Sequence, residues 1–351
     1  GQYRSLVYGD GKFVACSLNP SSARIIYSTD GKNWLEAVQP PANGWGGVAL
    51  GVDSLSGNPL WIAVANNGNN NRLIKSSNGI NWQNGSTSSV VGTKNWTCLA
   101  YGNGRFVALS GSSQGLYSTD GNTWVLSSLP TGLAYRNVAF GGATGEEKFV
   151  GVSNNSGIVY STNGSSWTRV SPVATGRDWQ DVCWGNDKWV AVSYGGTNRV
   201  AYSSDGSSWT DVTTLGALDS ASWQTVTYGP SGFVAIAATG SPHVMTSPDG
   251  VTWTAGLLES PLTLPSWSSI AYGAGVYAVV SNNSAMWSNS GSGLNTNELF
   301  IAGAVTDGFI VNDVLTTDST GGSGTITNLT NTSVTVSSPS GFQTGQRIVT
   351  S

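Results

Sequence analysis

An eight-residue motif that repeats seven times along the chain limits the folds that this sequence can adopt. Consecutive copies of the motif lie 41 to 48 residues apart. A fixed period of this length indicates a repeat architecture, so the fold is expected to contain seven copies of one unit. The copies are YSTDGKNW at 27–34, KSSNGINW at 75–82, YSTDGNTW at 117–124, YSTNGSSW at 160–167, YSSDGSSW at 202–209, TSPDGVTW at 246–253 and a degraded WSNSGSGL at 287–294.

Each repeat carries a second landmark, an aromatic residue that opens a strand-like run ending in Gly. A turn and an apolar run such as KFVACS follow it, then a polar loop, a strand ending in the eight-residue motif, and a strand leaving from its Trp. This order predicts four short strands in each repeat. The landmark occurs as QYRSLVYG at 2–9, GWGGVALG at 44–51, NWTCLAYG at 95–102, AYRNVAFG at 134–141, DWQDVCWG at 178–185, SWQTVTYG at 222–229 and SWSSIAYG at 266–273.

Four short strands in a repeat of this length make one blade of a β-propeller. The sequence therefore predicts an all-β fold, a seven-bladed β-propeller over 1–303 in which each blade covers its neighbours. The chain is expected to enter on the innermost strand of blade 1 at Tyr3, and the outer strand of blade 7 is expected within 296–303. Residues 304–351 alternate Thr, Val and Ile between Gly-Ser turns, which predicts a small β-rich module that continues beyond Ser351.

The repeated residues of the eight-residue motif favour a structural role. An Asp or Asn can accept hydrogen bonds from turn amides, Gly supplies the positive φ of a tight turn, and Trp covers the turn with apolar surface. Aspartates in separate blades cannot converge on one metal ion, which argues against a metal-binding or catalytic role. The residues assigned to this structural hairpin are Asp30, Gly31, Trp34, Trp82, Asp120, Gly121, Trp124, Trp167, Asp205, Gly206, Trp209, Asp249, Gly250 and Trp253.

The motif YSTDGNTW resembles the Asp-box (BNR) hairpin of sialidase-like and related propellers, whose pattern is Ser-x-Asp-x-Gly-x-Thr-Trp. This sequence lacks the residue between Asp and Gly, so the resemblance is to the wider class of propellers with DGxxW repeats, and it covers 1–294. In that class the motif marks the fold rather than an activity. The C-terminal segment, with FIVNDVLTT and GTITNLTNTSVTVSS, is similar to small modules of phage tail and fibre proteins, notably those of phages that infect marine cyanobacteria.

A catalytic site is not expected from the distribution of charged residues. Glycoside hydrolysis generally needs two carboxylates, or a Tyr and Glu pair, in one pocket, and a sialidase is expected to bring three arginines around the substrate carboxylate. Only Arg4 and Arg136 share a repeat position, and no third arginine joins them. His243 is the only histidine, which leaves no Ser-His-Asp arrangement. The sequence therefore predicts a protein that is not an enzyme and that has no metal ion or cofactor.

The low charge of the chain argues against two classes of partner. Charged residues make up 10% of the sequence, and the net charge is -4. No basic surface is expected that would bind nucleic acid or an anionic membrane. No apolar run reaches the roughly 18 residues of a membrane-spanning helix. We therefore predict neither a nucleic-acid partner nor membrane insertion.

The aromatic residue that opens each repeat is a candidate for ligand binding. On the innermost strands, seven such rings would form a circle near one mouth of the central channel, beside loops rich in Asn. Aromatic faces and amide groups suit the apolar faces and hydroxyl edges of sugars. The alternative is that the rings pack between adjacent blades, and repetition fits both interpretations. The candidates are Tyr3, Trp45, Trp96, Tyr135, Trp179, Trp223 and Trp267, with Asn154, Asn155, Asn282 and Asn283 in the loops.

These observations favour a recognition domain of a phage tail fibre or virion surface protein that binds host-surface glycan. One alternative is a structural spacer or decoration domain that binds only other virion proteins. Another is a secreted microbial lectin. The expected location is the virion, or otherwise the extracellular space, and the C-terminal module is a candidate site for homo-oligomer formation.

Overall fold

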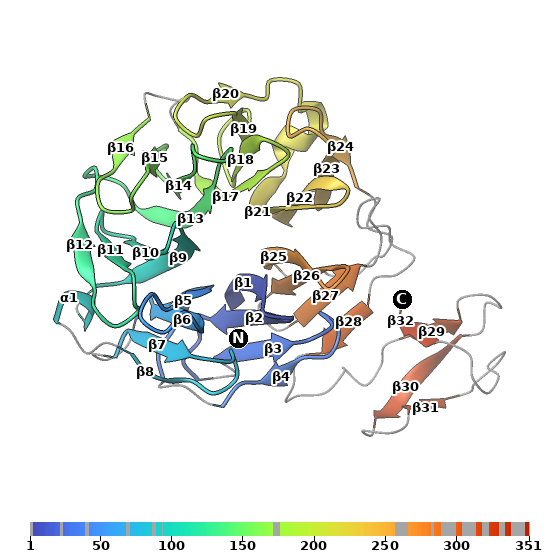
Figure 1. The fold of residues 1–351 in the computed structure, drawn as a ribbon. Coiled ribbons are helices and arrows are strands. Elements are labelled where there is room, and N and C mark those ends of the chain that lie inside the picture. Colours follow the sequence, from blue (N-terminus) through green and yellow to red (C-terminus); the bar gives the residue numbers. More distant parts are fainter. Residues whose placement is uncertain are drawn as a thin grey trace.

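The computed structural model confirms the all-β fold and the ring of seven blades with four antiparallel strands each (Figure 1). In every blade the strands follow chain order from the innermost strand outward. The structure describes residues 3–281 apart from 22–23, 39–41, 68–70, 86–88, 93, 171–175 and 257–265, together with 284–288 and the backbone of 300–303, 314–317, 323–329, 334–337 and 348–350.

The two inner strands of each blade come from the aromatic landmark and the apolar run that follows it. The innermost strands are β1 (Tyr3–Gly9), β5 (Trp45–Val52), β9 (Trp96–Gly102), β13 (Tyr135–Gly141), β17 (Trp179–Gly185), β21 (Ser222–Gly229) and β25 (Trp267–Gly273). The second strands are β2 (Lys12–Ser17), β6 (Pro59–Ala65), β10 (Arg105–Ser110), β14 (Lys148–Ser153), β18 (Lys188–Ser193), β22 (Gly232–Thr239) and β26 (Val276–Ser281).

The eight-residue motif joins the two outer strands of each blade. The third strands are β3 (Ile25–Ser28), β7 (Leu73–Ser76), β11 (Gly115–Ser118), β15 (Ile158–Ser161), β19 (Val200–Ser203), β23 (Val244–Ser247) and β27 (Ser284–Ser288). The outermost strands are β4 (Leu35–Glu36), β8 (Gln83–Asn84), β12 (Val125–Ser127), β16 (Thr168–Arg169), β20 (Thr210–Asp211), β24 (Thr254–Ala255) and β28 (Phe300–Gly303). As predicted, β28 supplies the outer strand of blade 7.

The ring closes where blade 1 packs against blade 7, with β1 beside β25 (Figure 1). All four strands of blade 7 come from the end of the propeller sequence, so the two ends of the ring share no strand. The N–H of Leu6 donates to Ser269 Oγ at 3.2 Å, and the ammonium group of Lys32 lies 3.7 Å from the ring centroid of Trp287. Side-by-side packing between the blades therefore holds the ring closed.

Two short helices were not predicted, because neither is long enough to show a helical period. They are α1 (Ser89–Gly92) and the 3₁₀ helix η1 (Gly216–Ser220). Each places a carbonyl oxygen over a buried indole: Trp96 Nε1 donates to Val91 at 2.9 Å, and Trp223 Nε1 donates to Leu218 at 2.9 Å. No helix in the described part of the chain is long and apolar enough to cross a membrane.

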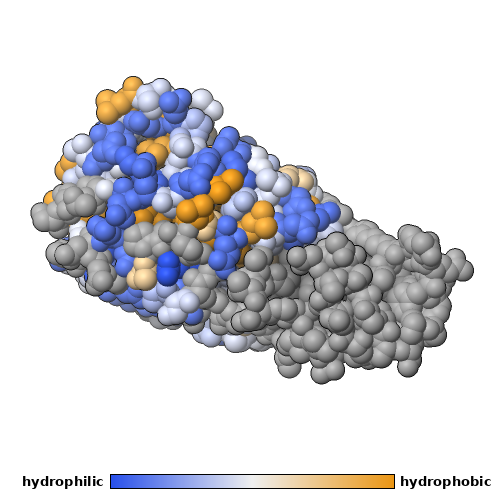
Figure 2. All heavy atoms as spheres, turned by 90° about the horizontal axis from the view of Figure 1, so that it is seen from below, coloured by the Kyte–Doolittle hydropathy of each residue, from blue (hydrophilic) through white to orange (hydrophobic). Residues whose placement is uncertain are grey.

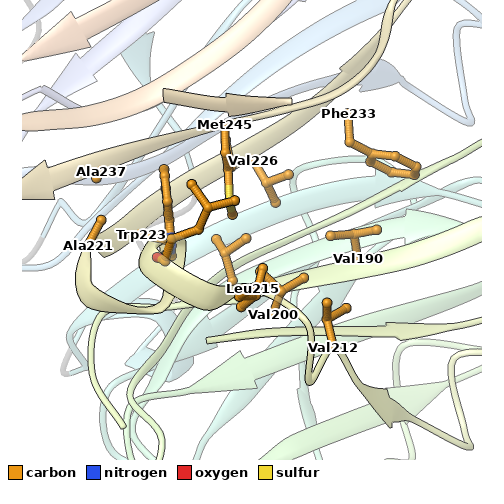
Figure 3. Close-up of a cluster of buried hydrophobic side chains, with 13 residues drawn as sticks. Val190, Val200, Val212, Leu215, Ala221, Trp223, Val226, Phe233, Ala237 and Met245 are labelled. Carbon is orange, nitrogen blue, oxygen red and sulfur yellow. The ribbon is translucent and has the colours of Figure 1, made fainter. Parts of the chain in front are cut away.

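The hydrophobic core is divided into seven clusters, one at each interface between blades. Figure 3 shows the cluster between blades 5 and 6, where Val190 and Val200 of blade 5 face Trp223, Val226 and Phe233 of blade 6. The side of the propeller seen in Figure 2 is mostly hydrophilic, with hydrophobic residues in small separate groups. Because a blade cannot bury both faces alone, each depends on its neighbours.

The hairpin of blade 1 shows how the eight-residue motif forms a blade corner. Asp30 Oδ1 accepts hydrogen bonds from the N–H groups of Lys32 (2.9 Å) and Asn33 (2.8 Å), and Trp34 Nε1 donates to the carbonyl of Gly31 at 3.1 Å. Gly31 has φ +73°, and a Cβ atom there would lie 2.7 Å from Val276 Cγ2 in blade 7. Both the turn and the neighbouring blade therefore require Gly. The same indole bond is made by Trp82, Trp124, Trp167, Trp209 and Trp253.

In the C-terminal part of the chain, the described residues form four further strands. They are β29 (Val314–Thr317), β30 (Ser323–Leu329), β31 (Val334–Ser337) and β32 (Ile348–Thr350), and they pair in the order β31-β30-β29-β32. The division into a propeller at 1–303 and a separate module at 304–351 stays a prediction, as does homo-oligomer formation through that module.

Candidate functional site

The seven aromatic residues that open the repeats lie between the blades and not on the channel surface. Each belongs to a different one of the seven hydrophobic clusters. Their rings are buried too completely to contact a ligand from solvent, so we correct the predicted aromatic circle in favour of its alternative, packing between blades. The exposed fractions are 3% for Tyr3, 2% for Trp267 and 0% for Trp45, Trp96, Tyr135, Trp179 and Trp223.

The asparagines predicted beside that circle have different environments. Asn155 connects two loops, because its side chain accepts the N–H of Ala134 at 3.2 Å and donates to the carbonyl of Gly132. Asn154 is half-buried, and its backbone N–H donates to the carbonyl of Ala134 at 3.2 Å. Asn282 and Asn283 lie outside the described residues. The contacts of Asn155 are therefore used by the fold itself.

The residue that follows each of these aromatics is the extra residue of a β-bulge. In blade 1, Tyr3 pairs with Ser17 and Ser5 pairs with Cys16, so Arg4 between them has no partner. A bulge turns a side chain away from the regular alternation of its strand. All seven bulge residues line a cavity of about 170 Å³ at the centre of the ring. They are Arg4, Gly46, Thr97, Arg136, Gln180, Gln224 and Ser268.

The next residue of the innermost strand often connects neighbouring blades, and Asp181 makes the most such contacts. Its carboxylate accepts hydrogen bonds from the N–H groups of Val182 (2.8 Å) and Val226 (2.9 Å), from Thr225 Oγ1 (2.7 Å) and from Asn137 Nδ2. Burial raises the pKa of Asp181, and these four hydrogen bonds act against that rise. Because the donors come from blades 4, 5 and 6, this carboxylate is part of the scaffold.

Arg4 and Arg136 are the two charged bulge residues. Within the residues that the structure describes, neither side chain makes a hydrogen bond or an ion pair, and Arg136 Nε is buried without a partner. Burial lowers the pKa of Arg4, and the positive charge of Arg136 lowers it further. A guanidinium group stays protonated in a protein, so two positive charges face the cavity, together with the carboxylate of Asp181, which also lines it and acts to raise the pKa of Arg4. Because neither guanidinium group makes a hydrogen bond within the described residues, both can donate to an anionic ligand.

A chain of hydrogen bonds runs from the cavity wall to its mouth. Gln224 Nε2 donates to Gln180 Oε1 at 3.4 Å, and Gln180 Nε2 donates to Asp178 Oδ1 at 2.7 Å. Burial raises the pKa of Asp178, whereas the charge of Arg136 acts to lower it. The mouth therefore places a carboxylate within the electrostatic reach of the two arginines.

The donors of the cavity suit an anion better than a metal ion. Guanidinium and amide N–H groups attract carboxylate, sulfate or phosphate oxygens. Among the described residues, no three His, Cys, Asp or Glu side chains are grouped so that they could hold a metal ion. The expected absence of a metal ion and a cofactor stays a prediction.

Comparison with known proteins identifies the fold but not a family. No protein-family model matches the chain, and no curated protein matches it in sequence. A streptogramin B lyase structure has a TM-score of 0.62 and 16% identity over 80% of this chain and 90% of its own. A structure of YCF48 bound to D1 peptide has a TM-score of 0.59 and 14% identity over 80% and 90%. Virginiamycin B lyase from Staphylococcus aureus has a TM-score of 0.57 and 12% identity over 80% and 92%.

At such low identity these likenesses show the propeller fold alone. They nevertheless overturn the prediction that a chain of this architecture is not an enzyme, because two of the similar structures are lyases. The prediction rested on the absence of a recognisable carboxylate pair, arginine triad or Ser-His-Asp arrangement, and such an absence does not exclude catalysis on this fold. A shared fold does not by itself give this chain an activity.

Proposed function

We propose that the propeller is a recognition domain that binds an acidic glycan of a host surface, with the anionic group of the ligand between Arg4 and Arg136. The main support for this proposal is that Arg4 and Arg136 line the same cavity and that neither side chain makes a hydrogen bond or an ion pair within the described residues. Arginine binds carboxylate and sulfate groups through paired N–H donors. A hydrogen bond to a charged group contributes about 1.5–3 kcal/mol, which corresponds to roughly 10- to 150-fold in affinity.

The other groups of the cavity support a ligand that carries hydroxyl groups. Gln180, Gln224 and Ser268 add amide and hydroxyl groups to the wall. The volume of about 170 Å³ equals the space of roughly five or six water molecules. The cavity therefore admits one acidic group with its nearest substituents, and the rest of a glycan chain would lie outside the mouth.

The setting that we propose is the surface of a virion, as part of a tail fibre or a related surface protein. The low content of charged residues and the similarity of the C-terminal segment to phage tail modules support this setting. A secreted lectin would use the same cavity in the same way. A structural spacer is not expected to bind an anionic ligand at these arginines, so ligand binding separates these alternatives.

A second candidate ligand is an acidic peptide. The YCF48 structure of the same fold was solved with a bound peptide. In this chain a peptide would place a side-chain or terminal carboxylate between Arg4 and Arg136, and its backbone would contact the mouth. The two candidates share the anionic group and differ in what surrounds it.

Isothermal titration calorimetry with three probes tests the proposal: a hyaluronan hexasaccharide, neutral cellohexaose and a glutamate-rich peptide. We expect the hyaluronan probe to bind more tightly than cellohexaose. Arg4→Gln and Arg136→Gln should each weaken binding at least 10-fold, whereas Arg169→Gln, on the exposed outer strand β16, should not. Unchanged affinity in both cavity variants would overturn the proposal, and preference for the peptide would favour the second candidate.

A further inference from the structure

The repeats provide an internal comparison at the mouth of the cavity. In four blades the residue after the second strand donates its N–H to the carbonyl of the residue before the buried aromatic. The pairs are Asn66 and Gly44 (2.8 Å), Gly111 and Asn95 (3.3 Å), Asn154 and Ala134 (3.2 Å), and Tyr194 and Asp178 (2.9 Å). Blades 2, 3 and 4 make this bond without an aromatic or an acidic side chain at either position. Blade 5 alone among the four has an aromatic and an acidic side chain at these two positions.

Tyr194 has the position and the exposure of a binding residue. Its side chain is 38% exposed, in contrast to the buried aromatics between the blades. The carbonyl of Asp178 that accepts its N–H also accepts Gln180 Nε2 at 3.3 Å, and Gln180 lines the cavity. Tyr194 therefore lies next to Asp178, which is hydrogen-bonded to the cavity wall, and it is partly exposed to solvent. None of the described residues forms a hydrogen bond with the hydroxyl group of Tyr194.

Asp178 adds an acceptor to the same place. Its Oδ1 accepts the bond from Gln180, and its Oδ2 makes no hydrogen bond within the described ranges. The carboxylate is partly exposed and lies within the field of Arg136. A carboxylate with a free oxygen can accept hydrogen bonds from two hydroxyl groups. An aromatic face with such an acceptor beside it suits the apolar face and the hydroxyl edge of one sugar ring.

We propose that Tyr194 and Asp178 form a pyranose subsite at the mouth of the cavity, for a sugar whose carboxylate reaches Arg4 and Arg136. This inference rests on the proposed function and narrows its ligand class to a uronic-acid type of pyranose. The sugar ring packs on Tyr194, its hydroxyl groups donate to Asp178, and its carboxylate enters the cavity. Asp178 also repels a second negative charge at the mouth, which disfavours ligands with acidic groups on adjacent positions.

Titration with methyl β-D-glucuronide and with acetate, at equal ionic strength, separates the subsite from the arginine pair. We expect the intact chain to bind the glucuronide at least 10-fold more tightly than acetate. Tyr194→Ala and Asp178→Asn should each lower the affinity for the glucuronide at least 5-fold and leave acetate within 2-fold. Tyr194→Phe should keep most of the affinity, because it keeps the ring. Asn66→Ala changes the equivalent position of blade 2 and serves as the control.

The two proposals fail in different ways. If Tyr194→Ala and Asp178→Asn leave the glucuronide affinity unchanged while Arg4→Gln lowers it, the subsite is overturned and the arginine site stands. If Arg4→Gln and Arg136→Gln bind both probes as the intact chain does, the proposed function itself is overturned. If Asp178→Asn raises the affinity for both probes equally, Asp178 acts only as a nearby negative charge, and the proposed contact with the sugar hydroxyl groups is wrong. Absence of binding for both probes would overturn both proposals.

Discussion

Arg4 and Arg136 face one cavity from opposite parts of the ring, and the charge of Arg136 adds to burial in lowering the pKa of Arg4. Arg177, which is 2% exposed, shows the opposite arrangement. Its guanidinium group is paired with both carboxylate oxygens of Asp211, and its Nε donates to the carbonyl of Thr197 at 2.9 Å. Arg4 and Arg136 make no such pair within the described residues, so their N–H groups can donate to a ligand.

Replacing one of the cavity arginines should separate stability from binding. We expect Arg4→Gln to raise the free energy of unfolding by about 1 kcal/mol, since like charges in a partly enclosed site repel each other with an energy of that order. The same variant should lose the rise in melting temperature that an acidic ligand gives the intact chain. Differential scanning fluorimetry with and without hyaluronan hexasaccharide measures both effects. A fall in the ligand-free melting temperature would show that Arg4 has a structural partner.

The contact between Tyr8 and Gly273 should be critical for closing the ring. A Cβ atom on Gly273 would lie 2.0 Å from Tyr8 Cγ, so even Ala requires the ring of Tyr8 to move. We expect Gly273→Ala to destabilise the propeller by about 2–3 kcal/mol. The control is Gly111→Ala, where the nearest atom would be 3.6 Å away. Chemical denaturation measures both variants, and a double variant with Tyr8→Ala should recover part of the loss. Equal stability of the two single variants would contradict this role.

Acid should weaken the blade corners. Burial acts to raise the pKa of Asp30, but hydrogen bonds from the turn outweigh it and hold the pKa at about 2. A depressed pKa gives stability that is present above the unfolded value near 3.9 and is lost as the pH falls toward 2. The pKa values of the equivalent carboxyls are also lowered; these are Asp120, Asp205 and Asp249.

The chain itself supplies the control for this pH effect. Asn78 and Asn163 occupy the same position in blades 2 and 4 and accept the same kind of turn bond, from Ile80 N at 3.0 Å and from Ser165 N at 2.9 Å. Changing all four aspartates to Asn should therefore change the unfolding free energy little at pH 7 and flatten its fall between pH 4 and 2. Urea unfolding between pH 7 and pH 2 measures the unfolding free energy of both proteins. If the variant loses stability in acid as much as the parent does, the acid sensitivity does not come from these four aspartates.

The ring of seven blades could be predicted because local sequence encodes each corner. The turn residues of the hairpin, such as Asp30 and Gly31, and the Trp that follows them specify a short strand pair without reference to the rest of the chain. Seven such corners at a regular spacing leave few alternatives to a closed ring. The short helices α1 and η1 were missed, since four or five residues carry no periodic pattern.

The functional site was harder to predict, because its geometry depends on a bulge. Simple alternation along the strand places Trp179 and Gln180 on opposite faces, but no chemical feature of either residue marks the extra residue between paired positions. The bulge turns Gln180 and its equivalents toward the channel, while the aromatic rings remain between the blades. One signal was present in the sequence: Arg4 and Arg136 occupy the same position of different repeats. The sequence did not show that these two arginines lie close to each other; the structure shows it, because both line the same cavity.

The buried aromatics should respond to mutation as core residues. Trp223 is fully buried among residues of blades 5 and 6, and its Nε1 donates to Leu218 at 2.9 Å (Figure 3). We expect Trp223→Ala to lower the free energy of unfolding by about 3–5 kcal/mol, as other large-to-small aromatic changes in cores do. Tyr194→Ala should cost clearly less than Trp223→Ala, because Tyr194 is 38% exposed whereas Trp223 is fully buried. Denaturation curves for both variants, measured beside glucuronide binding, test the contrast. If Trp223→Ala keeps its stability but loses glucuronide binding, the buried aromatic residues belong to the ligand site after all.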